Sequence, residues 1–401
     1  MIFQECSIIK RHIRSLNRLN ILFVTPVNLG YPGGAERWLC EVGMRLSKRG
    51  HKIGILYTSW APKKTLVTDI ISLLHRSRSI RLYKCGFVKP PLRGMALVDI
   101  FSIRRVLNDY DLSYIFAYPP NELQIRFFKR LIQKTLIAGI HTFLNLESDI
   151  IHRLYLPLYL SGMKAFKAIH VLNKFTLNFF KQNGFRNVYL IPNGVDTQEY
   201  KLCYPPWGSD TFTILFSGRL TYDKGADILI DIIKCTRTFL NEKVKFVITG
   251  TGPLRKVVER TAKEFSNVKY LGYVDRAVLK QVYRRAHLFL APSRSEGMPL
   301  RVLEAQSGGL PVIGSKIPGI FDVVINGETG CLINVGDVKG FAGAVKKYYE
   351  LWRRSPEEYY KTNKAIRRYI VKNYDWQTVI ERLEAMFRLV IDESHRSGNL
   401  C

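Results

Sequence analysis

Asn20-Ile-Leu-Phe-Val-Thr-Pro26 and the residues that follow it decide the fold of this chain. The short, continuous apolar run is typical of a buried parallel strand, and it leads into a glycine-rich loop over residues 28–36. Apolar residues then recur at helical spacing up to a basic stretch that ends at Gly50, which predicts a helix. Residues 52–57 form another apolar run. Strand, loop, helix and strand in this order open a doubly wound α/β domain.

The same order begins again in the second half of the chain. Thr211-Phe-Thr-Ile-Leu-Phe-Ser-Gly218 predicts a strand, and after a loop a helix is expected from about Ala226. Residues 244–250, 288–291 and 310–314 supply further strand cores. The sequence therefore predicts two Rossmann-like α/β domains that face one another across a cleft, with ligands bound at the carboxyl ends of both sheets.

Domain boundaries are placed where this pattern changes. Residues 20–195 are predicted to form the first domain and residues 211–374 the second. Residues 196–210 contain prolines and no clear periodicity, which indicates a linker. Residues 375–401 open with an amphipathic helix that we expect to cross back to the first domain. Basic residues threaded between apolar ones make residues 1–19 a basic amphipathic leader.

Length and composition fit this organisation. A chain of 401 residues suits two domains of roughly 150–200 residues each. Its 47% hydrophobic and 12% aromatic residues exclude a disordered protein. The net charge of +28 would attract nucleic acid, an anionic membrane or phosphorylated substrates. Charge alone does not choose among these, and a solvated basic surface without a dedicated partner is the alternative.

Cysteine spacing and hydropathy indicate the compartment. The seven cysteines contain no pair at metal or redox spacing, so we predict reduced thiols in a cytosolic protein. No window holds the ~18 uninterrupted apolar residues of a spanning helix. Arg126-Phe-Phe-Lys-Arg-Leu-Ile-Gln-Lys134 is both cationic and apolar, and is our candidate for peripheral contact with an anionic inner membrane face. An ordinary amphipathic surface helix is the alternative.

Two carboxylates mark the segment Ser293-Arg-Ser-Glu-Gly-Met-Pro-Leu-Arg-Val-Leu-Glu-Ala-Gln306. Glu296 is expected in a loop after a strand, and Glu304 more than a turn inside the helix that follows. Three residues would offer backbone N–H groups to a phosphate at the helix N-terminus: Gly297, Met298 and Leu300. A carboxylate within the helix can accept two hydrogen bonds from a vicinal diol such as ribose, although carboxylates also cap helices for structural reasons alone.

Glu296-Gly-Met-Pro-Leu-Arg-Val-Leu-Glu-Ala-Gln306 resembles the Glu-x7-Glu signature of the retaining GT-B glycosyltransferases called family 4. The similarity continues through Gly308-Gly-Leu-Pro-Val-Ile-Gly314, Pro318-Gly319 and Asn326-Gly-Glu-Thr-Gly330. The resemblance implies a GT-B fold whose first domain binds the acceptor and whose second binds a nucleotide diphosphate sugar. It also implies that the earlier glutamate contacts the transferred sugar and the later one the ribose hydroxyls.

Arg219 and Lys224 lie in the loop between a predicted strand and a predicted helix. A diphosphate leaving group needs positive charge as its bond to the sugar breaks, and arginine supplies bidentate geometry. The loop resembles the Gly-Arg…Lys-Gly motif of the same family, which serves this purpose and generally manages without a metal ion. We therefore predict no metal and no cofactor besides the nucleotide sugar. Two solvated loop cations are the alternative.

Further site residues follow from the resemblance. Gly33 and Gly34 match the glycine-rich turn in which a backbone N–H reaches the donor diphosphate, and glycine leaves room for that approach. His141 ends a predicted strand where the family often has a histidine that contacts the transferred sugar or the acceptor. Val274 lies in a segment similar to the one that lines the nucleobase through backbone contacts. We predict that His170 is structural.

The expected function is retaining transfer of a hexosyl unit to a hydroxyl, such as that of a lipid-linked or phosphorylated glycan precursor in polysaccharide or glycoconjugate synthesis. Two alternatives keep the fold: a sugar-nucleotide epimerase and a non-catalytic nucleotide-sugar-binding protein. Nucleic-acid binding is less well supported, because no recognised motif or aromatic-basic stripe accompanies the charge. Asp109-Tyr-Asp111 has the spacing of a metal site, but it precedes a predicted strand and a turn-capping role is favoured.

Overall fold

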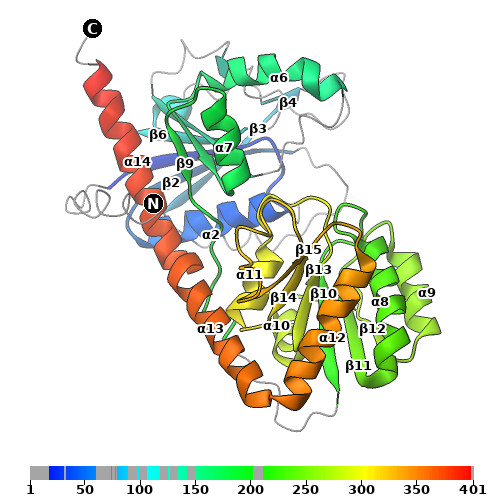
Figure 1. Ribbon diagram of the computed structural model, residues 1–401. Coiled ribbons are helices and arrows are strands. Elements are labelled where there is room, and N and C mark those ends of the chain that lie inside the picture. Colours follow the sequence, from blue (N-terminus) through cyan, green and yellow to red (C-terminus); the bar gives the residue numbers. More distant parts are fainter. Residues whose placement is uncertain are drawn as a thin grey trace. The chain divides into compact units, whose positions relative to one another are not determined.

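The computed structural model describes residues 18–30, 33–59, 74, 77, 79–88, 97–98, 106–117, 125–126, 134–141, 150–201 and 211–398. The chain divides into two compact units (Figure 1). The first unit takes the chain up to Ile191 and again from Ile380, and the second unit spans Pro192–Val379. The predicted leader, residues 1–19, lies outside the described residues except for its last two.

The first unit is built on a parallel sheet in the order β3-β2-β1-β6-β7-β8-β9. Its strands are β1 (Asn20–Thr25), β2 (Lys52–Thr58), β3 (Ile80–Cys85), β6 (Leu112–Phe116), β7 (Thr135–Ile140), β8 (Ala168–Val171) and β9 (Val188–Leu190). A separate antiparallel pair consists of β4 (Phe87–Val88) and β5 (Leu97–Val98). The strand order reverses direction at β1, the switch point of a doubly wound sheet.

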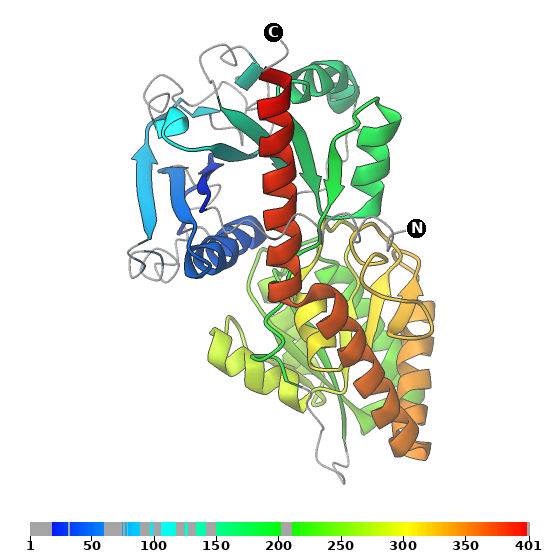
Figure 2. The same ribbon diagram turned by 90° about the vertical axis from the view of Figure 1, so that its left-hand side faces the viewer.

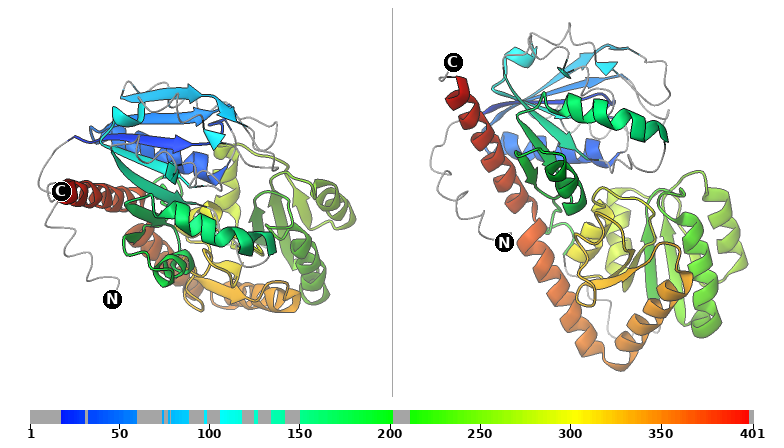
Figure 3. Two further views of the ribbon diagram at one scale, coloured as in Figure 1. Left: turned by 90° about the horizontal axis from the view of Figure 1, so that it is seen from above. Right: turned by 45° about the horizontal axis from the view of Figure 1, so that its top comes forward.

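Helices cover both faces of this sheet (Figures 1 and 3). They are α2 (Gly34–Lys48), α6 (Ile150–Met163), α7 (Lys174–Gln182) and α14 (Trp376–Gly398). On one face, Trp38 of α2 stacks on Tyr114 with ring centroids 5.4 Å apart, and Phe387 of α14 lies 6.3 Å from the same tyrosine ring. On the other face, α6 and α7 contact each other through Tyr159 and Phe180.

Helix α14 completes the first unit from the far end of the chain (Figure 2). Glu384 accepts two hydrogen bonds from the Arg49 guanidinium, both 2.8 Å, and lies 2.7 Å from His51 Nε2. Near the end of the helix, Thr135 Oγ1 donates to Ser394 Oγ. The helix predicted to open residues 375–401 is thus observed, and its residues from Ile380 onward belong to the first unit.

The second unit repeats the plan with a parallel sheet in the order β12-β11-β10-β13-β14-β15. Its strands are β10 (Phe212–Ser217), β11 (Val244–Thr249), β12 (Val268–Tyr270), β13 (Leu288–Ala291), β14 (Val312–Ser315) and β15 (Gly330–Ile333). Its helices are α8 (Ala226–Leu240), α9 (Arg255–Glu264), α10 (Arg276–Arg285), α11 (Leu300–Ser307), α12 (Val338–Arg354) and α13 (Pro356–Tyr374), with a short 3-10 helix at Asn241–Lys243.

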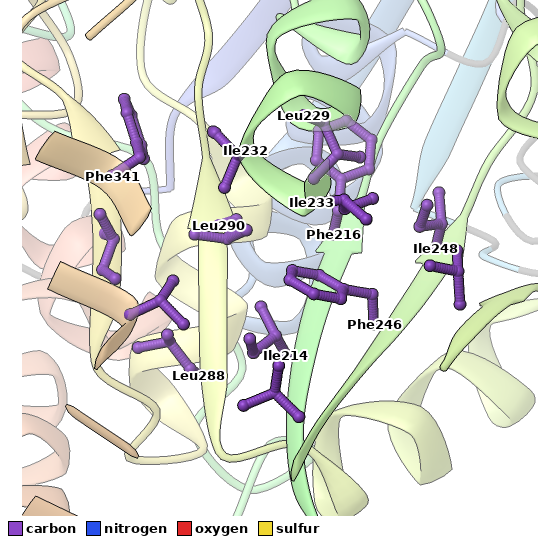
Figure 4. Packing of buried hydrophobic residues seen from close by; sticks show 14 of the residues in the cluster. Ile214, Phe216, Leu229, Ile232, Ile233, Phe246, Ile248, Leu288, Leu290 and Phe341 are labelled. Carbon is purple, nitrogen blue, oxygen red and sulfur yellow. The ribbon is translucent and has the colours of Figure 1, made fainter. Parts of the chain in front are cut away.

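A continuous apolar core lies between this sheet and its helices (Figure 4). The alternate residues of three strands interdigitate with the inward faces of α8 and α12, as the period of two in a strand and 3.6 in a helix requires. The labelled side chains are Ile214, Phe216, Leu229, Ile232, Ile233, Phe246, Ile248, Leu288, Leu290 and Phe341. This core fixes the carboxyl ends of β10 and β13, from which the candidate site projects.

The described part of the predicted linker, residues 196–201, is anchored to the second unit. Arg367 donates hydrogen bonds to the carbonyl oxygens of Thr197 and Tyr200, at 3.0 and 2.7 Å. Just before it, the Val195 N–H donates to the Tyr374 carbonyl and the Trp376 N–H donates back to Val195. Residues 202–210 of the predicted linker lie outside the described residues.

Candidate functional site

Two loops of the second unit bring Lys224 and Glu296 together. Lys224 lies in the loop after β10, and Glu296 in the loop after β13, the adjacent parallel strand. Lys224 Nζ is 2.6 Å from Glu296 Oε2, and Ser293 Oγ donates to Glu296 Oε1 at 3.0 Å. Both charged side chains are largely buried, at 21% and 12% exposed. The carboxylate is therefore held in one orientation by a cation and a hydroxyl.

Arg294 clamps the same two loops. Its guanidinium makes a bidentate pair with Asp227 at the start of α8, both bonds 2.7 Å, and also donates to the Tyr222 carbonyl. The pairing lowers the pKa of the Asp227 carboxyl, chiefly through the hydrogen bond from Arg294. The backbone N–H of Arg294 adds a 2.8 Å bond to the Asp223 carbonyl. Sequence reasoning missed this clamp, because nothing local links residues so far apart in the chain.

Close backbone contacts make two glycines of these loops necessary. Gly225 has φ +66°, and a Cβ there would lie 2.0 Å from the Pro292 carbonyl oxygen. Gly319 has φ +82°, and a Cβ there would lie 2.4 Å from the Gly297 oxygen. Both positions favour glycine on conformation and on space. The loops after β10, β13 and β14 are therefore packed backbone to backbone around Glu296.

Arg219, the other predicted cation, is the more exposed member of the group. Its side chain is 56% exposed and pairs with Asp223 Oδ2 at 3.2 Å. Lys224 Nζ lies 3.9 Å from the same carboxylate oxygen. Asp223 thus links the two cations of the loop, and an incoming polyanion could replace a carboxylate that is 43% exposed.

Glu304 occupies the middle of α11, as predicted. Helix α11 begins at Leu300, one residue later than expected, with Pro299 as its N-cap residue. Glu304 is 2% exposed, and its Oε2 accepts hydrogen bonds from Arg301 at 2.8 Å and from the Tyr283 hydroxyl at 3.2 Å. Burial, followed by the nearby Glu304 charge, raises the pKa of Tyr283 well above its usual value.

The turn before α11 is supported from outside the signature. Asn193 Nδ2 donates to the Met298 carbonyl at 2.9 Å, and the Asn193 N–H contacts Met298 Sδ at 3.0 Å. Met298 is buried. Val274 is half-buried and follows Gly272, whose φ is +68° and whose carbonyl accepts from the Gly250 N–H. The predicted nucleobase segment is thus joined to the loop after β11.

Gly33 and Gly34 lie in the first unit, at the start of α2. Gly33 is the N-cap residue, and nothing lies within 4 Å of a Cβ placed on Gly34. Two residues later, the buried Glu36 carboxyl has its pKa raised to about 7 by burial. Sequence reasoning quoted Glu36 with the loop but gave it no role.

His141 follows β7, as predicted, and its ring is hydrogen-bonded within the first unit. Tyr114 Oη lies 2.8 Å from His141 Nε2 and 2.6 Å from His170 Nδ1. His170 Nε2 in turn lies 2.8 Å from the Ile191 carbonyl. Burial lowers the pKa of both histidines, His170 to about 4 and His141 well below its usual value, with His170 contributing to the latter shift. Sequence reasoning missed Tyr114, which looked like one more core residue of a strand.

The remaining candidates do not form sites in the described structure. Asp111 Oδ2 accepts from the Asn20 backbone N–H at 2.9 Å, a structural role in line with the favoured interpretation. No group of three or more potential metal ligands occurs among the described residues. No helix within the described ranges is long and apolar enough to cross a membrane. Of the predicted membrane patch, Arg126 and Lys134 are described and residues 127–133 are not.

Two family models match most of the chain. Residues 32–199 match the model described as Glycosyltransferase Family 4, and residues 211–350 match the one described as Glycosyl transferases group 1. The first match falls in the first unit and the start of the second, and the second match covers every loop described around Glu296.

Named relatives and solved structures are similar over different lengths. One relative, from Arabidopsis thaliana and named for phosphatidylinositol N-acetylglucosaminyltransferase, is 30% identical over 52% of this chain, which spans about half of that protein, 46%. Phosphatidyl-myo-inositol mannosyltransferase of Mycobacterium leprae is 23% identical over 93% of this chain and 97% of that protein. The structure of Anabaena HepE in complex with UDP has a TM-score of 0.73 at 19% identity, covering 92% of this chain and 100% of that chain.

Proposed function

The chain belongs to glycosyltransferase family 4, and on this premise we propose that it transfers a hexosyl unit from a nucleotide diphosphate sugar to a hydroxyl acceptor, with retention of configuration. The fold is GT-B, as the sequence predicted. The observation that carries the proposal is the Lys224–Glu296 pair, held at 2.6 Å where two adjacent strands end. A carboxylate for sugar hydroxyls beside a cation for phosphate is the arrangement that a sugar diphosphate requires.

The proposed roles follow the charges. Arg219 and Lys224 would stabilise the negative charge that grows on the diphosphate as its bond to the sugar breaks. Glu296 would orient the transferred sugar, and Glu304 would accept hydrogen bonds from the ribose hydroxyls. Backbone groups of Gly33, Gly34, Gly297, Met298, Leu300 and Val274 would line the diphosphate and the base, and His141 would contact a sugar hydroxyl.

These roles need no metal ion, because two side-chain cations already face the position proposed for the diphosphate. We expect transfer to proceed at an unchanged rate after dialysis against a chelator. Restoration of lost activity by a divalent cation would contradict this part of the proposal.

The donor test combines binding with one substitution. In a panel of nucleotide sugars headed by UDP-glucose and UDP-N-acetylglucosamine, the true donor should raise Tm by mass action. Glu296→Gln keeps the shape of the side chain but removes the charge that pairs with Lys224, and should lower kcat at least about a hundredfold. Glu259→Gln is the matched control, because Glu259 pairs with Arg255 on α9, outside these loops.

Two outcomes would contradict the proposed function. One is the absence of a thermal shift with every nucleotide sugar in the panel. The other is transfer by Glu296→Gln at the wild-type rate. Interconversion of nucleotide sugars without any acceptor would favour the epimerase, and donor binding without turnover would favour the non-catalytic alternative.

For the acceptor, we propose a lipid-linked or phosphorylated glycan precursor at the cytoplasmic face of a membrane. The two relatives described above are named for transfer to phosphatidylinositol. On the first unit, α6 exposes Leu154 and Leu158, at 74% and 54%, one turn apart on one side of the helix. Arg126 Nη1 donates to the Ser161 carbonyl, which attaches the start of the predicted basic patch to this helix. Exposed leucines beside cations suit an anionic bilayer surface.

Vesicle flotation tests the membrane proposal. The protein should float with vesicles that contain anionic lipid at low salt, and binding should weaken with rising salt. The double variant Leu154→Asp/Leu158→Asp should stay at the bottom of the gradient. Phe239→Asp is the matched control, because Phe239 is 46% exposed on α8 of the second unit. Equal flotation of all three proteins, or none at low salt, would remove this surface from consideration.

A further inference from the structure

The hydrogen-bonded series of His141, Tyr114 and His170 joins three adjacent strands of the first unit. Tyr114 lies on β6, His141 follows β7 and His170 lies on β8. Tyr114 and His170 are both fully buried. Gly139 makes room for the tyrosine, because a Cβ on Gly139 would lie 2.1 Å from the Tyr114 hydroxyl oxygen. The three groups are thus placed by the sheet itself.

The direction of the hydrogen bonds is set at the Ile191 end. A carbonyl oxygen only accepts, so His170 Nε2, 2.8 Å from the Ile191 oxygen, carries a proton. In a neutral imidazole the other nitrogen, Nδ1, is then an acceptor. The Tyr114 hydroxyl therefore donates to His170 Nδ1 across 2.6 Å. Burial keeps His170 neutral, because it lowers the pKa of this side chain to about 4.

The same logic extends to His141. A tyrosine hydroxyl has one proton, and Tyr114 gives it to His170. Toward His141 the phenol oxygen can then only accept, so His141 Nε2, 2.8 Å away, carries the proton. Neutral His141 consequently keeps a lone pair on Nδ1. That nitrogen takes part in no hydrogen bond with another described residue, and the ring remains partly exposed.

The aromatic surroundings hold the His141 ring in place. Trp38 lies edge-on with ring centroids 4.5 Å apart, and Phe116 lies 4.7 Å away on another side. Neither neighbour offers a second acceptor to Nε2. The ring therefore cannot exchange its two nitrogens without losing the bond to Tyr114.

We propose that Tyr114 and His170 are positioning residues that fix His141 as a hydrogen-bond acceptor, so that its Nδ1 receives a substrate hydroxyl and not a phosphate oxygen. The proposal rests on the proposed function for the identity of the substrate. It goes further in stating which atom of His141 faces the ligand and in which protonation state. A phosphate oxygen offers no proton to a bare nitrogen lone pair, whereas a sugar hydroxyl does.

The first test measures the tautomer without any substrate. Nitrogen-15 NMR of the histidine-labelled, full-length protein should show His141 protonated at Nε2 and bare at Nδ1, with the signal assigned by its loss in His141→Asn. In His170→Leu the Tyr114 proton no longer has its acceptor and can turn toward His141, so Nδ1 should become protonated in a measurable fraction. Protonated Nδ1 in the wild type, or no change in His170→Leu, would overturn the proposal.

The second test is kinetic. Tyr114→Phe and His170→Leu should each lower kcat/KM about tenfold, the factor that one lost neutral hydrogen bond of ~1.4 kcal/mol represents. His170→Gln should restore most of the rate, because its amide can donate to Ile191 and accept from Tyr114. Tyr110→Phe is the matched control, since Tyr110 is also buried and bonds to Tyr83 Oη at 3.0 Å. Equal losses in Tyr110→Phe and Tyr114→Phe would reduce the series to a structural role.

The kinetic arms also separate two sources of the hydroxyl. If the donor sugar supplies it, donor KM and slow donor hydrolysis should both change in Tyr114→Phe. If the acceptor supplies it, only acceptor KM and transfer should change. A wild-type protein that turns over no nucleotide sugar would contradict the proposed function, yet the NMR measurement would still decide the tautomer.

Discussion

Glycine serves two different purposes among the residues of the candidate site. Gly225 and Gly319 are required by the protein itself, because a side chain at either would collide with a neighbouring carbonyl and φ is positive. Gly34 has neither constraint, since nothing lies within 4 Å of its added Cβ. A glycine that the free protein does not need is one that a ligand could need.

Gly34→Ala should therefore separate folding from binding. Alanine in the first turn of α2 should leave Tm unchanged or slightly higher, because alanine is the better helix former by up to ~1 kcal/mol. Donor KM should nevertheless rise about tenfold if the diphosphate approaches this backbone. Gly225→Ala provides the contrast, with an expected loss of at least about 2 kcal/mol in the free energy of unfolding. Thermal melts and donor titrations distinguish the two, and unchanged donor KM in Gly34→Ala would exclude this glycine from the site.

At the scale of elements, the site depends on how the loop after β10 is held against the loop after β13. Arg294 makes this connection through its bidentate pair with Asp227 and its bond to the Tyr222 carbonyl. The clamp is 40% exposed on the arginine side, so its direct contribution to stability is small. Its effect should appear in the geometry of Lys224 and Glu296.

Arg294→Lys tests the clamp. Lysine keeps the charge but cannot form the bidentate pair, so the free energy of unfolding should fall by no more than about 1 kcal/mol. Donor KM should rise several-fold, because the loop that carries Lys224 is less well fixed relative to Glu296. Arg255→Lys on α9, which breaks a similar exposed pair with Glu259, should change neither quantity. A loss of stability without a change in donor KM would mean that the clamp has no influence on the site.

Elements also explain what the sequence could predict. The buried runs of β1, β10 and β13 and the glycines after them are local signals, and they placed Glu296 and Lys224 at the carboxyl ends of strands. That β10 and β13 are neighbours follows from topology, which brings the two side chains within 2.6 Å. Tyr114 and Arg294 could not be predicted in this way. Their roles depend on side-chain directions between segments far apart in the sequence, and a core tyrosine or a loop arginine carries no local mark of its partner.

At the scale of the whole molecule, buried neutral histidines set the response to acid. Burial lowers the pKa of His170 and of His287 to about 4, in the first and second unit respectively. In the unfolded chain both titrate near 6.5, so the unfolded state binds more protons between about pH 6.5 and 4. The stability that these groups contribute is fully present above pH 6.5 and is lost as pH falls through 4.

Denaturant unfolding across this range should show the effect. The free energy of unfolding of the wild type should fall from pH 6.5 to pH 4, and the slope should be shallower in His170→Gln, which has no proton to bind at that position. Glu36, with its pKa raised to about 7, acts in the opposite direction between about pH 4.5 and 7. The difference between wild type and variant cancels that contribution. A pH-independent difference would show that His170 is not kept neutral by burial.

Helix α14 has a consequence for how the protein is made. Residues up to Ile191 leave the ribosome first, yet the sheet face that carries Tyr114 is covered in part by Phe387, near the end of the chain. The Arg49 and His51 side chains likewise receive their carboxylate from Glu384 only then. The first unit therefore remains unfinished for as long as the second is being synthesised, and a nascent or prematurely terminated chain presents an apolar sheet face to the chaperones that meet it.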